Sequence, residues 1–416
     1  MGGFKLGLIV AILFVIAIVN DWSTPDDLII TLLVVLGISW VWSRVSLHRL
    51  GFSRSLSLDR VRAGEWISEE LTLRNYALVP KLWVECRDHS SLPWYRAGRV
   101  VTLSSKGESR WVTQAQCRER GRFRLGPVSI RSGDPLGLFQ IEKLLPATHE
   151  LIVYPIALDV SDVPLPAANM SGGRSTNRNM AIAAHTISGL REYAPGDPLN
   201  QISWSATARR GQMMVKEFDP DPTSDVWVLV DLGTVLDRQS VHWGDSAKSL
   251  GGESSPVSLD DAEETMVALA ASIAERALNE GRKVGLLISR EMPIRLEPDN
   301  SQRQWFRIFE TLALATAFGQ RSLSEAIFAD ARKFSRTSGL VVVTASSSRD
   351  WVVAAQALVQ RHVPVTAVVV EGALDESARE LGVLVEELAA AHVALCRYDL
   401  HGRAVTGHQS AYRTVA

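Results

Sequence analysis

The sequence predicts a multidomain protein with a transmembrane helical hairpin, an all-β sandwich-like domain and an α/β doubly wound domain. Three observations predict it. Two long apolar runs stand at the amino end, short runs with period two follow, and buried strands alternate with helices in the second half. With 416 residues, the chain is also long enough for two or three domains.

Composition narrows the class of protein. Apolar residues make up 46% and charged residues 22%, close to average globular usage, which excludes a disordered chain, a collagenous chain and a polytopic transporter. The formal charge of -2 gives no reason to expect nucleic acid as a partner. Cys86, Cys117 and Cys396 are far apart and form no CxxC pair, so we expect reduced thiols rather than a disulfide framework or a zinc site.

Residues 1–50 are expected to form the membrane hairpin, with helices at about 2–19 and 28–45. The first run holds one charge, Lys5, and its 18 residues reach roughly 27 Å, about the hydrocarbon thickness. A cleaved signal peptide is the alternative for this run, but no clear Ala-x-Ala site ends it. For the second run, with Trp40 and Trp42 near its end, the alternative is a buried core helix.

The charges that flank the hairpin predict its orientation. The turn between the two runs carries only acids, whereas five arginines follow the second run: Arg44, Arg49, Arg54, Arg60 and Arg62. By the positive-inside rule, both termini and the domains after the hairpin should be cytoplasmic. The sequence therefore predicts a protein of the inner (plasma) membrane with two transmembrane helices.

Residues 51–155 are expected to form the β-sandwich-like domain. About seven short alternating runs, such as 66–73 and 82–86, are separated by glycine, proline and asparagine. Catalytic constellations are not recognisable there. Residues 156–225 then form a linker and a charged motif, since 156–185 are rich in Pro, Ala, Ser, Gly and Asn.

Residues 226–400 are expected to form the α/β domain, followed by a tail at 401–416. The predicted strands are 226–230, 283–289, 340–344, 365–370 and 393–398, and the predicted helices are 260–279, 302–317, 323–334, 351–360 and 375–391. Buried strands that alternate with helices indicate a doubly wound, mostly parallel sheet. The polar stretch 236–259 is expected to be a mobile loop at the carboxyl edge of the first strand.

The densest charged motif lies at 191–218, where Pro195-Gly196 favours a type II turn that brings flanking charges together. As a functional cluster, these charges would bind a ligand or catalyse a reaction. As a structural network of salt bridges, they would fasten the linker to the sheet. We favour the structural interpretation, because no nucleophile and base stand at a recognisable spacing. The motif residues are Arg191, Glu192, Tyr193, Pro195, Gly196, Asp197, Trp204, Ala208, Arg209, Lys216, Glu217 and Phe218.

This motif resembles the signature of the bacterial family 58 of the domains of unknown function. The family pattern runs approximately G-x-REY-x-PGD-x-x-R-x-I-D-W-x-x-x-AR and then VKEFE. Upstream, residues 120–128 and 134–139 are similar to the family's RG-x-x-x-LGP and DPFGLF elements. Two positions depart from the pattern: Asn200 stands where the family has Arg, and Ser203 where it has Asp.

The resemblance implies a membrane-anchored cytosolic protein with a β-rich region and a von Willebrand factor A-like domain, commonly encoded beside MoxR-type AAA+ ATPases. It implies no established reaction. We therefore expect an interaction or scaffold protein that works with such an ATPase in assembling or remodelling partner proteins, without a cofactor and without nucleic acid. The alternative is an enzyme that uses the charged cluster 191–217. Phosphate-loop, HExxH, GxSxG and EF-hand patterns are absent from the sequence.

The resemblance to A-domains also bears on metal binding. Adhesion-type A-domains hold Mg²⁺ through an Asp-x-Ser-x-Ser loop, a Thr and a distal Asp. Here Asp231 keeps the first carboxylate, but Gly233 and Val235 replace the serines, Thr344-Ala345-Ser346 stands in place of Thr-Asp-Gly, and the run from Arg321 offers no clear Thr. One carboxylate supplies too little charge for a hard cation, so we predict no working metal site. Arg321 could supply positive charge near Asp231.

Overall fold

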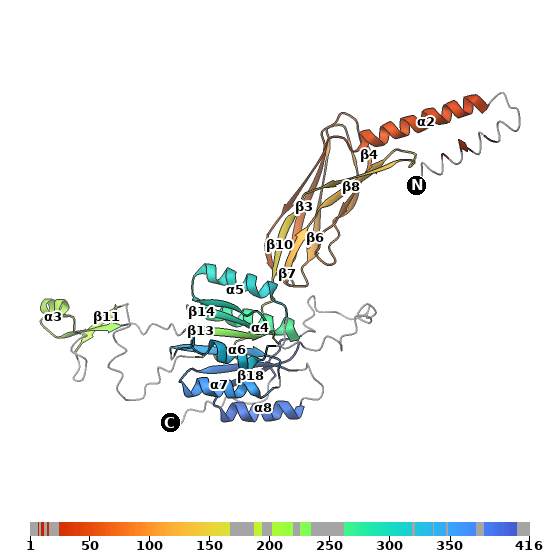
Figure 1. The fold of residues 1–416 in the computed structure, drawn as a ribbon. Helices are drawn as coiled ribbons and strands as arrows, with labels where there is room; N and C mark the ends of the chain where they lie inside the picture. Colours follow the sequence, from red (N-terminus) through yellow and green to blue (C-terminus); the bar gives the residue numbers. More distant parts are fainter. Residues whose placement is uncertain are drawn as a thin grey trace. The chain divides into compact units, whose positions relative to one another are not determined.

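The computed structural model describes residues 7, 10, 11, 15, 25–166, 187–193, 202–218, 225–233, 262–317, 321–335, 337–346, 348–371 and 378–405. The chain divides into two compact units, one formed by residues up to Ile156 and the other by most of the chain from Ala157 onward (Figure 1). The first is called the β unit and the second the α/β unit. Cys86, Cys117 and Cys396 are free cysteines, as the sequence predicted.

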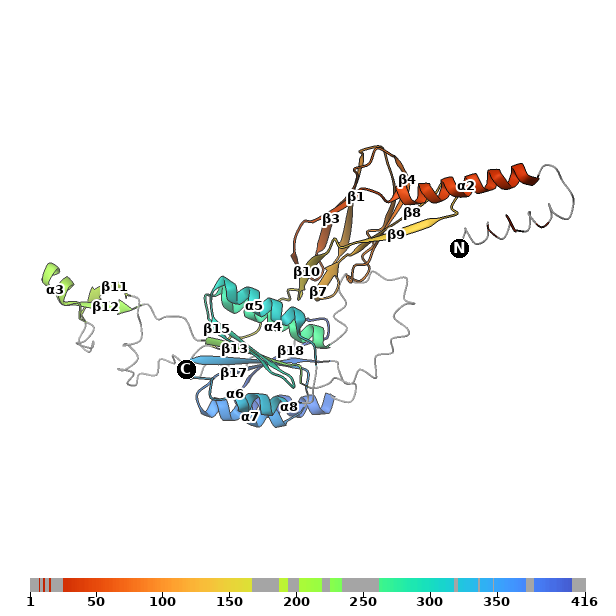
Figure 2. The same cartoon turned by 45° about the horizontal axis from the view of Figure 1, so that its top comes forward.

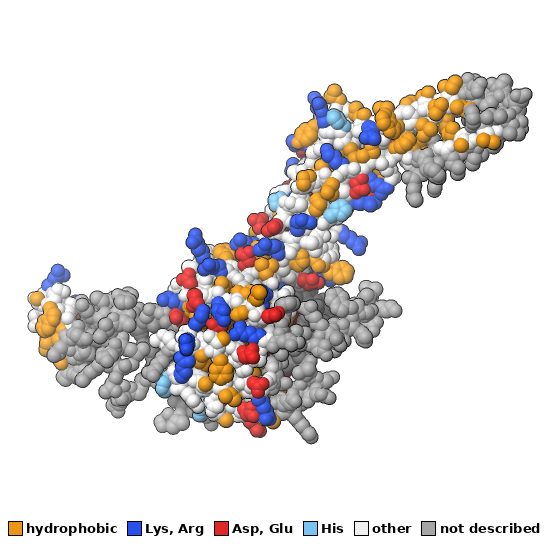
Figure 3. Space-filling model, viewed as in Figure 1, with side chains coloured by type: hydrophobic (Ala, Val, Ile, Leu, Met, Phe, Trp, Pro, Cys, Tyr) orange, Lys and Arg blue, Asp and Glu red, His pale blue; other side chains and the backbone are white. Residues whose placement is uncertain are grey.

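Helix α2 (Pro25–Ser46) leads into the β unit and packs on it through small residues. Ser39, Ser43 and Ser46 are buried and lie four and three residues apart, which places them on one side of the helix. Buried Lys81 donates from Nζ to the carbonyl of Val45, one of the last carbonyls of the helix, which have no partner within it. The outer face of α2, with Ile30, Leu33, Val34, Ile38 and Val41, is apolar and exposed (Figure 3).

The predicted transmembrane hairpin is wrong. Within the described part of the chain, no helix combines the length and the apolar character needed to cross a membrane. In α2, the charged residues Asp27 and Arg44 leave 16 residues between them, or roughly 24 Å, shorter than the ~30 Å hydrocarbon core, and three of the 16 are Thr or Ser. Most of the predicted first helix, 2–19, lies outside the described residues. The localisation in the inner membrane with two transmembrane helices is likewise wrong.

The β unit contains ten strands in three small sheets. The sheets have the orders β1-β3-β6, β2-β10-β7 and β5-β4-β8-β9, and their pairs are antiparallel except for the parallel pair β2–β10. The strands are β1 (Leu50–Leu56), β2 (Arg60–Arg62), β3 (Trp66–Asn75), β4 (Lys81–Asp88), β5 (Arg99–Leu103), β6 (Glu108–Gln116), β7 (Gly121–Leu125), β8 (Val128–Gly133), β9 (Gln140–Leu145) and β10 (His149–Tyr154).

Side chains that alternate between buried and more exposed positions along the strands form the core of this unit. In β3, buried residues recur at every second position, including Ile67, Leu71 and Leu73, as a sheet with one covered face requires. These residues join a single cluster with Trp111 and Val84 from other strands. The predicted sandwich-like domain is corrected here, because the strands are divided among three sheets rather than two facing ones.

The α/β unit is built on a six-stranded sheet in the order β15-β14-β13-β16-β17-β18. The strands are β13 (Asp225–Asp231), β14 (Val284–Ser289), β15 (Ile294–Asp299), β16 (Ser338–Thr344), β17 (Val365–Val370) and β18 (Ala394–Tyr398). Five strands run parallel, but the edge strand β15 is antiparallel to β14, so the sheet is mixed. The central strands are buried along their whole length, which explains their continuous apolar runs.

Helices cover both faces of this sheet (Figure 2). On one face lie α4 (Ala262–Asn279) and α5 (Gln302–Leu314); on the other lie α6 (Leu323–Asp330), α7 (Asp350–Gln360) and α8 (Ala378–Ala390). Most of α4 is buried against the sheet. The second face holds an apolar cluster that includes Trp227, Phe334 and Trp351.

Residues 157–166, which the sequence placed in the linker, lie along the amino edge of this sheet. Arg276 donates from Nη1 to the carbonyls of Val160 (2.6 Å) and Val163 (2.9 Å), and Thr366 donates from Oγ1 to the carbonyl of Pro164 (2.9 Å). Val163 is fully buried. Residues 160–166 therefore cover part of the amino edge of the sheet.

Candidate functional site at the carboxyl edge of the α/β sheet

The order of the strands marks where the α/β sheet can receive a ligand. From β13 the chain moves to β14 on one side, and later returns to β16 on the other side. Strand order thus reverses between β13 and β16. In open α/β sheets, the crevice outside the carboxyl ends of the strands at such a point is the usual binding position.

Three oxygen-bearing side chains form a row at this position. Asp231 ends β13, Ser289 ends β14 directly opposite it, and Thr344 ends β16 one step beyond the pair of Val230 with Val343. The row therefore runs Ser289, Asp231, Thr344 across three neighbouring strands. We call these residues the carboxyl-edge row. All are buried, with Asp231 only 2% exposed.

Hydrogen bonds hold the Asp231 carboxylate in one orientation. Thr344 donates from Oγ1 to Oδ2 (2.8 Å), and the amide of Gly233 donates to Oδ1 (3.4 Å). The amide of Ser346 in turn donates to Thr344 Oγ1 (3.0 Å), which fixes the hydroxyl. A buried carboxylate requires such donors, since an unpaired one would carry a large desolvation penalty.

Gly233 is required by the close approach of two other segments. A Cβ at this position would collide with the backbone carbonyl of Arg321 and lie 3.2 Å from Ser289 Oγ. The loop that begins at Arg321 therefore reaches the carboxyl-edge row through its backbone. A serine cannot replace Gly233 without displacing that loop, which gives a physical reason for the missing serine of the A-domain pattern.

The hydroxyl of Ser289 differs from the other polar groups of the row. It is 1% exposed and makes no hydrogen bond with the described residues. Buried hydroxyls are normally paired, so each exception calls for an explanation. Sequence reasoning missed Ser289, although its place at the end of the predicted strand 283–289 was a usable signal.

The donor set at this edge does not fit a hard divalent cation. The carboxyl-edge row offers one carboxylate and two hydroxyls, and one of those hydroxyls already donates to the carboxylate. Throughout the described ranges, His, Cys, Asp and Glu nowhere gather in threes as metal ligands would. Mg²⁺ and Ca²⁺ need several charged oxygens to offset their dehydration.

The charged motif forms a separate hairpin. Strands β11 (Ile187–Glu192) and β12 (Met214–Phe218) pair antiparallel, with Arg191 opposite Val215 and Leu190 opposite Lys216. Helix α3 (Trp204–Arg210) closes the hairpin: Thr207 Oγ1 accepts from the amide of Met214 (3.0 Å).

The predicted motif residues are placed unevenly. Arg191 and Glu192 lie on β11; Lys216, Glu217 and Phe218 lie on β12; Trp204, Ala208 and Arg209 lie on α3. The amide of Tyr193 donates to the carbonyl of Met213 (2.9 Å). Pro195, Gly196 and Asp197 lie outside the described residues. Trp204 is exposed, and the described ion pairs include none between motif residues.

Comparison with known proteins supports the resemblance seen in the motif. Residues 189–389 match the family model described as Protein of unknown function DUF58. The Uncharacterized protein YeaD of Bacillus subtilis (strain 168) is 25% identical over 199 residues, which cover 43% of this chain and 47% of that protein. The chain thus matches about half the length of this curated relative.

Solved structures give only weak likenesses. The CARDB domain of the PF1109 protein from Pyrococcus furiosus, in complex with di-metal ions, is 13% identical, with a TM-score of 0.20, over 26% of this chain and 96% of that one. A β-glucosidase from Listeria innocua is 13% identical, with a TM-score of 0.17, over 25% of this chain and 16% of that one. At these TM-scores neither likeness carries an argument.

Proposed function

Because residues 189–389 match the family model described as Protein of unknown function DUF58, we propose that this chain is an interaction protein that docks a partner at the carboxyl edge of its α/β sheet. The partner we propose is a MoxR-type AAA+ ATPase, with which the protein would act in assembling or remodelling other proteins. We also propose that the α/β unit is related to von Willebrand factor A domains, since its first strand ends in Asp231 and β16 ends in Thr344.

The observation that carries this proposal is the Ser289 hydroxyl, which makes no hydrogen bond with the described residues and lies at the end of the strand beside Asp231. A hydroxyl can both donate and accept, so a polar group from a partner could complete its hydrogen bonding. Residues 160–166 already cover part of the amino edge of the same sheet. The carboxyl edge is therefore the side of the sheet that we assign to docking.

The alternative is an enzyme built on the charged cluster 191–217, most of whose charged side chains lie outside the described residues. Its described part is a hairpin closed by α3, held by backbone pairing and the Thr207 hydroxyl. Asp197, the acid nearest the predicted turn, lies outside the described residues.

Binding to a purified MoxR-type ATPase tests the proposal. Affinity is measured with ATP, with ADP and without nucleotide, on the full chain and two variants. Thr344→Val removes the hydrogen bond that Thr344 donates to the Asp231 carboxylate at the carboxyl edge. Thr366→Val is the matched control, because it removes a buried hydroxyl bond from the amino edge of the neighbouring strand.

We expect ATP-dependent binding that Thr344→Val weakens about tenfold or more, because the Asp231 carboxylate loses a hydrogen bond that fixes its orientation, and that Thr366→Val leaves unchanged. Equal binding by both variants would place the interface elsewhere. Absence of binding, together with an activity that disappears in folded Asp197→Ala protein, would favour the enzyme instead.

A further inference from the structure

The loop between β4 and β5, residues 89–98, exposes a tryptophan on a strained backbone. Trp94 is 77% exposed, and its φ is 64°, in the left-handed region. Bulky side chains rarely adopt this conformation, because Cβ then crowds the following carbonyl. The backbone geometry costs free energy on folding, and the exposed ring recovers little of that cost through burial, so a functional reason for Trp94 is worth seeking.

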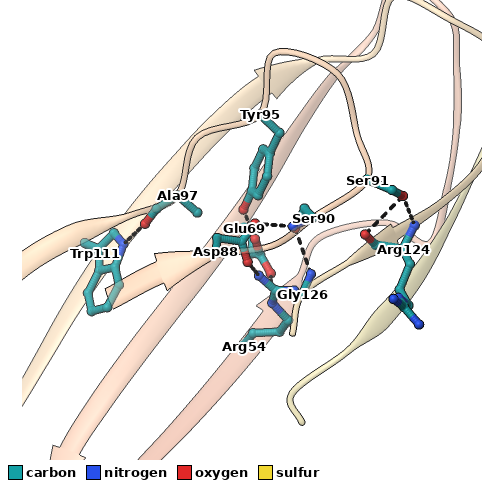
Figure 4. Close-up of polar contacts among 10 residues, drawn as sticks. All are labelled: Arg54, Glu69, Asp88, Ser90, Ser91, Tyr95, Ala97, Trp111, Arg124 and Gly126. Carbon is teal, nitrogen blue, oxygen red and sulfur yellow. Dashed lines mark hydrogen bonds and ion pairs between the residues drawn. The ribbon is translucent and has the colours of Figure 1, made fainter. Parts of the chain in front are cut away.

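The loop is fixed from several sides (Figure 4). The amide and hydroxyl of Ser91 bond the backbone of Arg124, at 2.8 Å in each case. Ser90 Oγ accepts from the amide of Gly126 (2.7 Å), and Ala97 O accepts from Trp111 Nε1 (3.2 Å). The residues beside Trp94 are thus tied to the core while Trp94 itself points to solvent.

The strongest tie lies directly under the loop. Tyr95, the neighbour of Trp94, is buried and donates its hydroxyl to Glu69 (Figure 4). Glu69 is held by Arg54, whose Nε lies 2.5 Å from Oε1, and Arg54 also contacts Asp88 at 2.6 Å. A loop anchored to such a network presents its exposed side chain without a large loss of freedom on binding.

The surroundings of Trp94 are basic. The guanidinium of Arg118 lies 5.9 Å from the centre of the Trp94 ring, and Arg96 and Arg124 are exposed on the same loop and on the strand bonded to it. Glu119 is an exposed acid beside them. Residues 47–156 contain 17 Lys and Arg against 11 Asp and Glu, although the whole chain is slightly acidic.

We propose that loop 89–98 is a docking site for an acidic protein segment that places an apolar side chain against Trp94. Tryptophan and arginine dominate the energetic centres of protein interfaces, and a positive rim selects a negative partner. Single-stranded nucleic acid fits less well, because its binders stack successive bases on several aromatic rings. Within this loop Trp94 is exposed and Tyr95 is buried.

A random-peptide phage library selected on the full chain tests the proposal. Enriched peptides are then compared on wild type, Trp94→Gly, Arg118→Glu and Trp66→Ala. Trp66 is the matched control, because it is also largely exposed in the β unit. Glycine is chosen at position 94 because it accepts the left-handed backbone. We therefore expect the Trp94→Gly variant to fold, and its thermal unfolding temperature to be higher than that of wild type.

We expect enriched peptides that combine Asp or Glu with an aromatic residue or leucine. Their affinity should fall at least tenfold in Trp94→Gly and in Arg118→Glu, and should be unchanged in Trp66→Ala. Enrichment of basic peptides, or of peptides indifferent to Trp94, would overturn the proposal. Trp94-dependent binding of a 15-nucleotide oligothymidine without any acidic peptide would also overturn it, in favour of nucleic acid.

Discussion

Buried carboxylates support both proposed docking surfaces, but different partners compensate their charge. Beneath loop 89–98 of the β unit, Glu69 and Asp88 share the single guanidinium of Arg54. At the carboxyl edge of the α/β unit, the hydrogen bonds described for Asp231 include those from the hydroxyl of Thr344 and the amide of Gly233, both neutral donors. The first arrangement couples three strands and a loop through charge, whereas the second joins neighbouring strand ends.

This difference sets how each region should respond to change. Removing the cation from a buried ion network leaves uncompensated charge, which destabilises the whole unit. Removing a neutral donor leaves one acceptor with one hydrogen bond fewer, which lowers the stability less and more locally. Loss of Arg54 under the docking loop should therefore destabilise the whole β unit, while loss of one neutral donor at the carboxyl edge should have a smaller effect on stability.

The largest effect is expected for Arg54→Met. This change leaves Glu69 and Asp88 buried together without a cation, and we expect a loss of about 3–5 kcal/mol in the free energy of unfolding. Urea unfolding of the full chain, followed by tryptophan fluorescence, measures it. The control is Arg74→Met, which breaks an exposed pair with Glu108 and should lose less than about 1 kcal/mol. Similar losses in both variants would show that burial does not distinguish the two pairs.

The second effect depends on pH and arises at Glu69. Burial raises the pKa of Glu69 from 4.5 to about 7, because Arg54, shared with Asp88, does not offset the desolvation. The folded protein thus holds this proton more tightly than the unfolded chain does. The stabilisation that protonated Glu69 contributes is fully present below the unfolded pKa of 4.5. As the pH rises through 7 this contribution is lost, which lowers the free energy of unfolding by at most about 3 kcal/mol.

Glu69→Gln isolates this titration. Glutamine keeps an acceptor for the Tyr95 hydroxyl but cannot ionise, so the fall in stability between pH 5 and pH 8 should be smaller in the variant than in wild type. The difference between the two pH profiles measures the Glu69 contribution. Parallel profiles would mean that Glu69 stays ionised in the folded protein throughout this range.

The third effect compares the two edges of the α/β sheet. Thr344→Val removes the buried hydrogen bond from Thr344 to Asp231 Oδ2, and should lower the free energy of unfolding by about 1–3 kcal/mol. Thr366→Val leaves the carbonyl of Pro164 without its donor, and should lower it by about 1 kcal/mol. Thermal unfolding of both variants measures the difference. A larger loss at Thr366 would identify the amino edge as the more critical one.

The α/β unit was largely predictable from the sequence, because periodicity reports burial. The runs 226–230 and 365–370 are continuous and apolar, and they form β13 and β17. Strand β15 was missed because it lies at the sheet edge, where its alternating residues are only half buried and resemble a loop. The partial covering of the amino edge by residues 160–166 was also missed, since polar contacts through carbonyls leave no side-chain pattern.

The membrane hairpin and the sites show where such reasoning fails. Hydropathy alone could not distinguish a membrane helix from α2, whose buried serines pack on the β unit. The A-domain pattern pointed to Asp231 and Thr344, which the structure brings together, but a pattern cannot reveal that the Ser289 hydroxyl makes no hydrogen bond with the described residues. The network of Arg54, Glu69 and Asp88 escaped notice because its members lie on three strands far apart in sequence.

The smallest effect on stability, and the sharpest test of the comparison, is expected for Ser289→Ala. The Ser289 hydroxyl is buried without a hydrogen bond among the described residues, so its removal eliminates a desolvation penalty and creates a cavity of only one oxygen atom. These contributions oppose each other, and the free energy of unfolding should change by less than about 0.5 kcal/mol or rise slightly.

Binding of the ATPase should nevertheless weaken, because the partner loses the group whose hydrogen bonding it completes. Thermal unfolding and affinity, measured on the same preparation, separate the two quantities. Marked destabilisation of Ser289→Ala would show that the hydroxyl has a structural partner, and would remove the observation on which docking at the carboxyl edge depends.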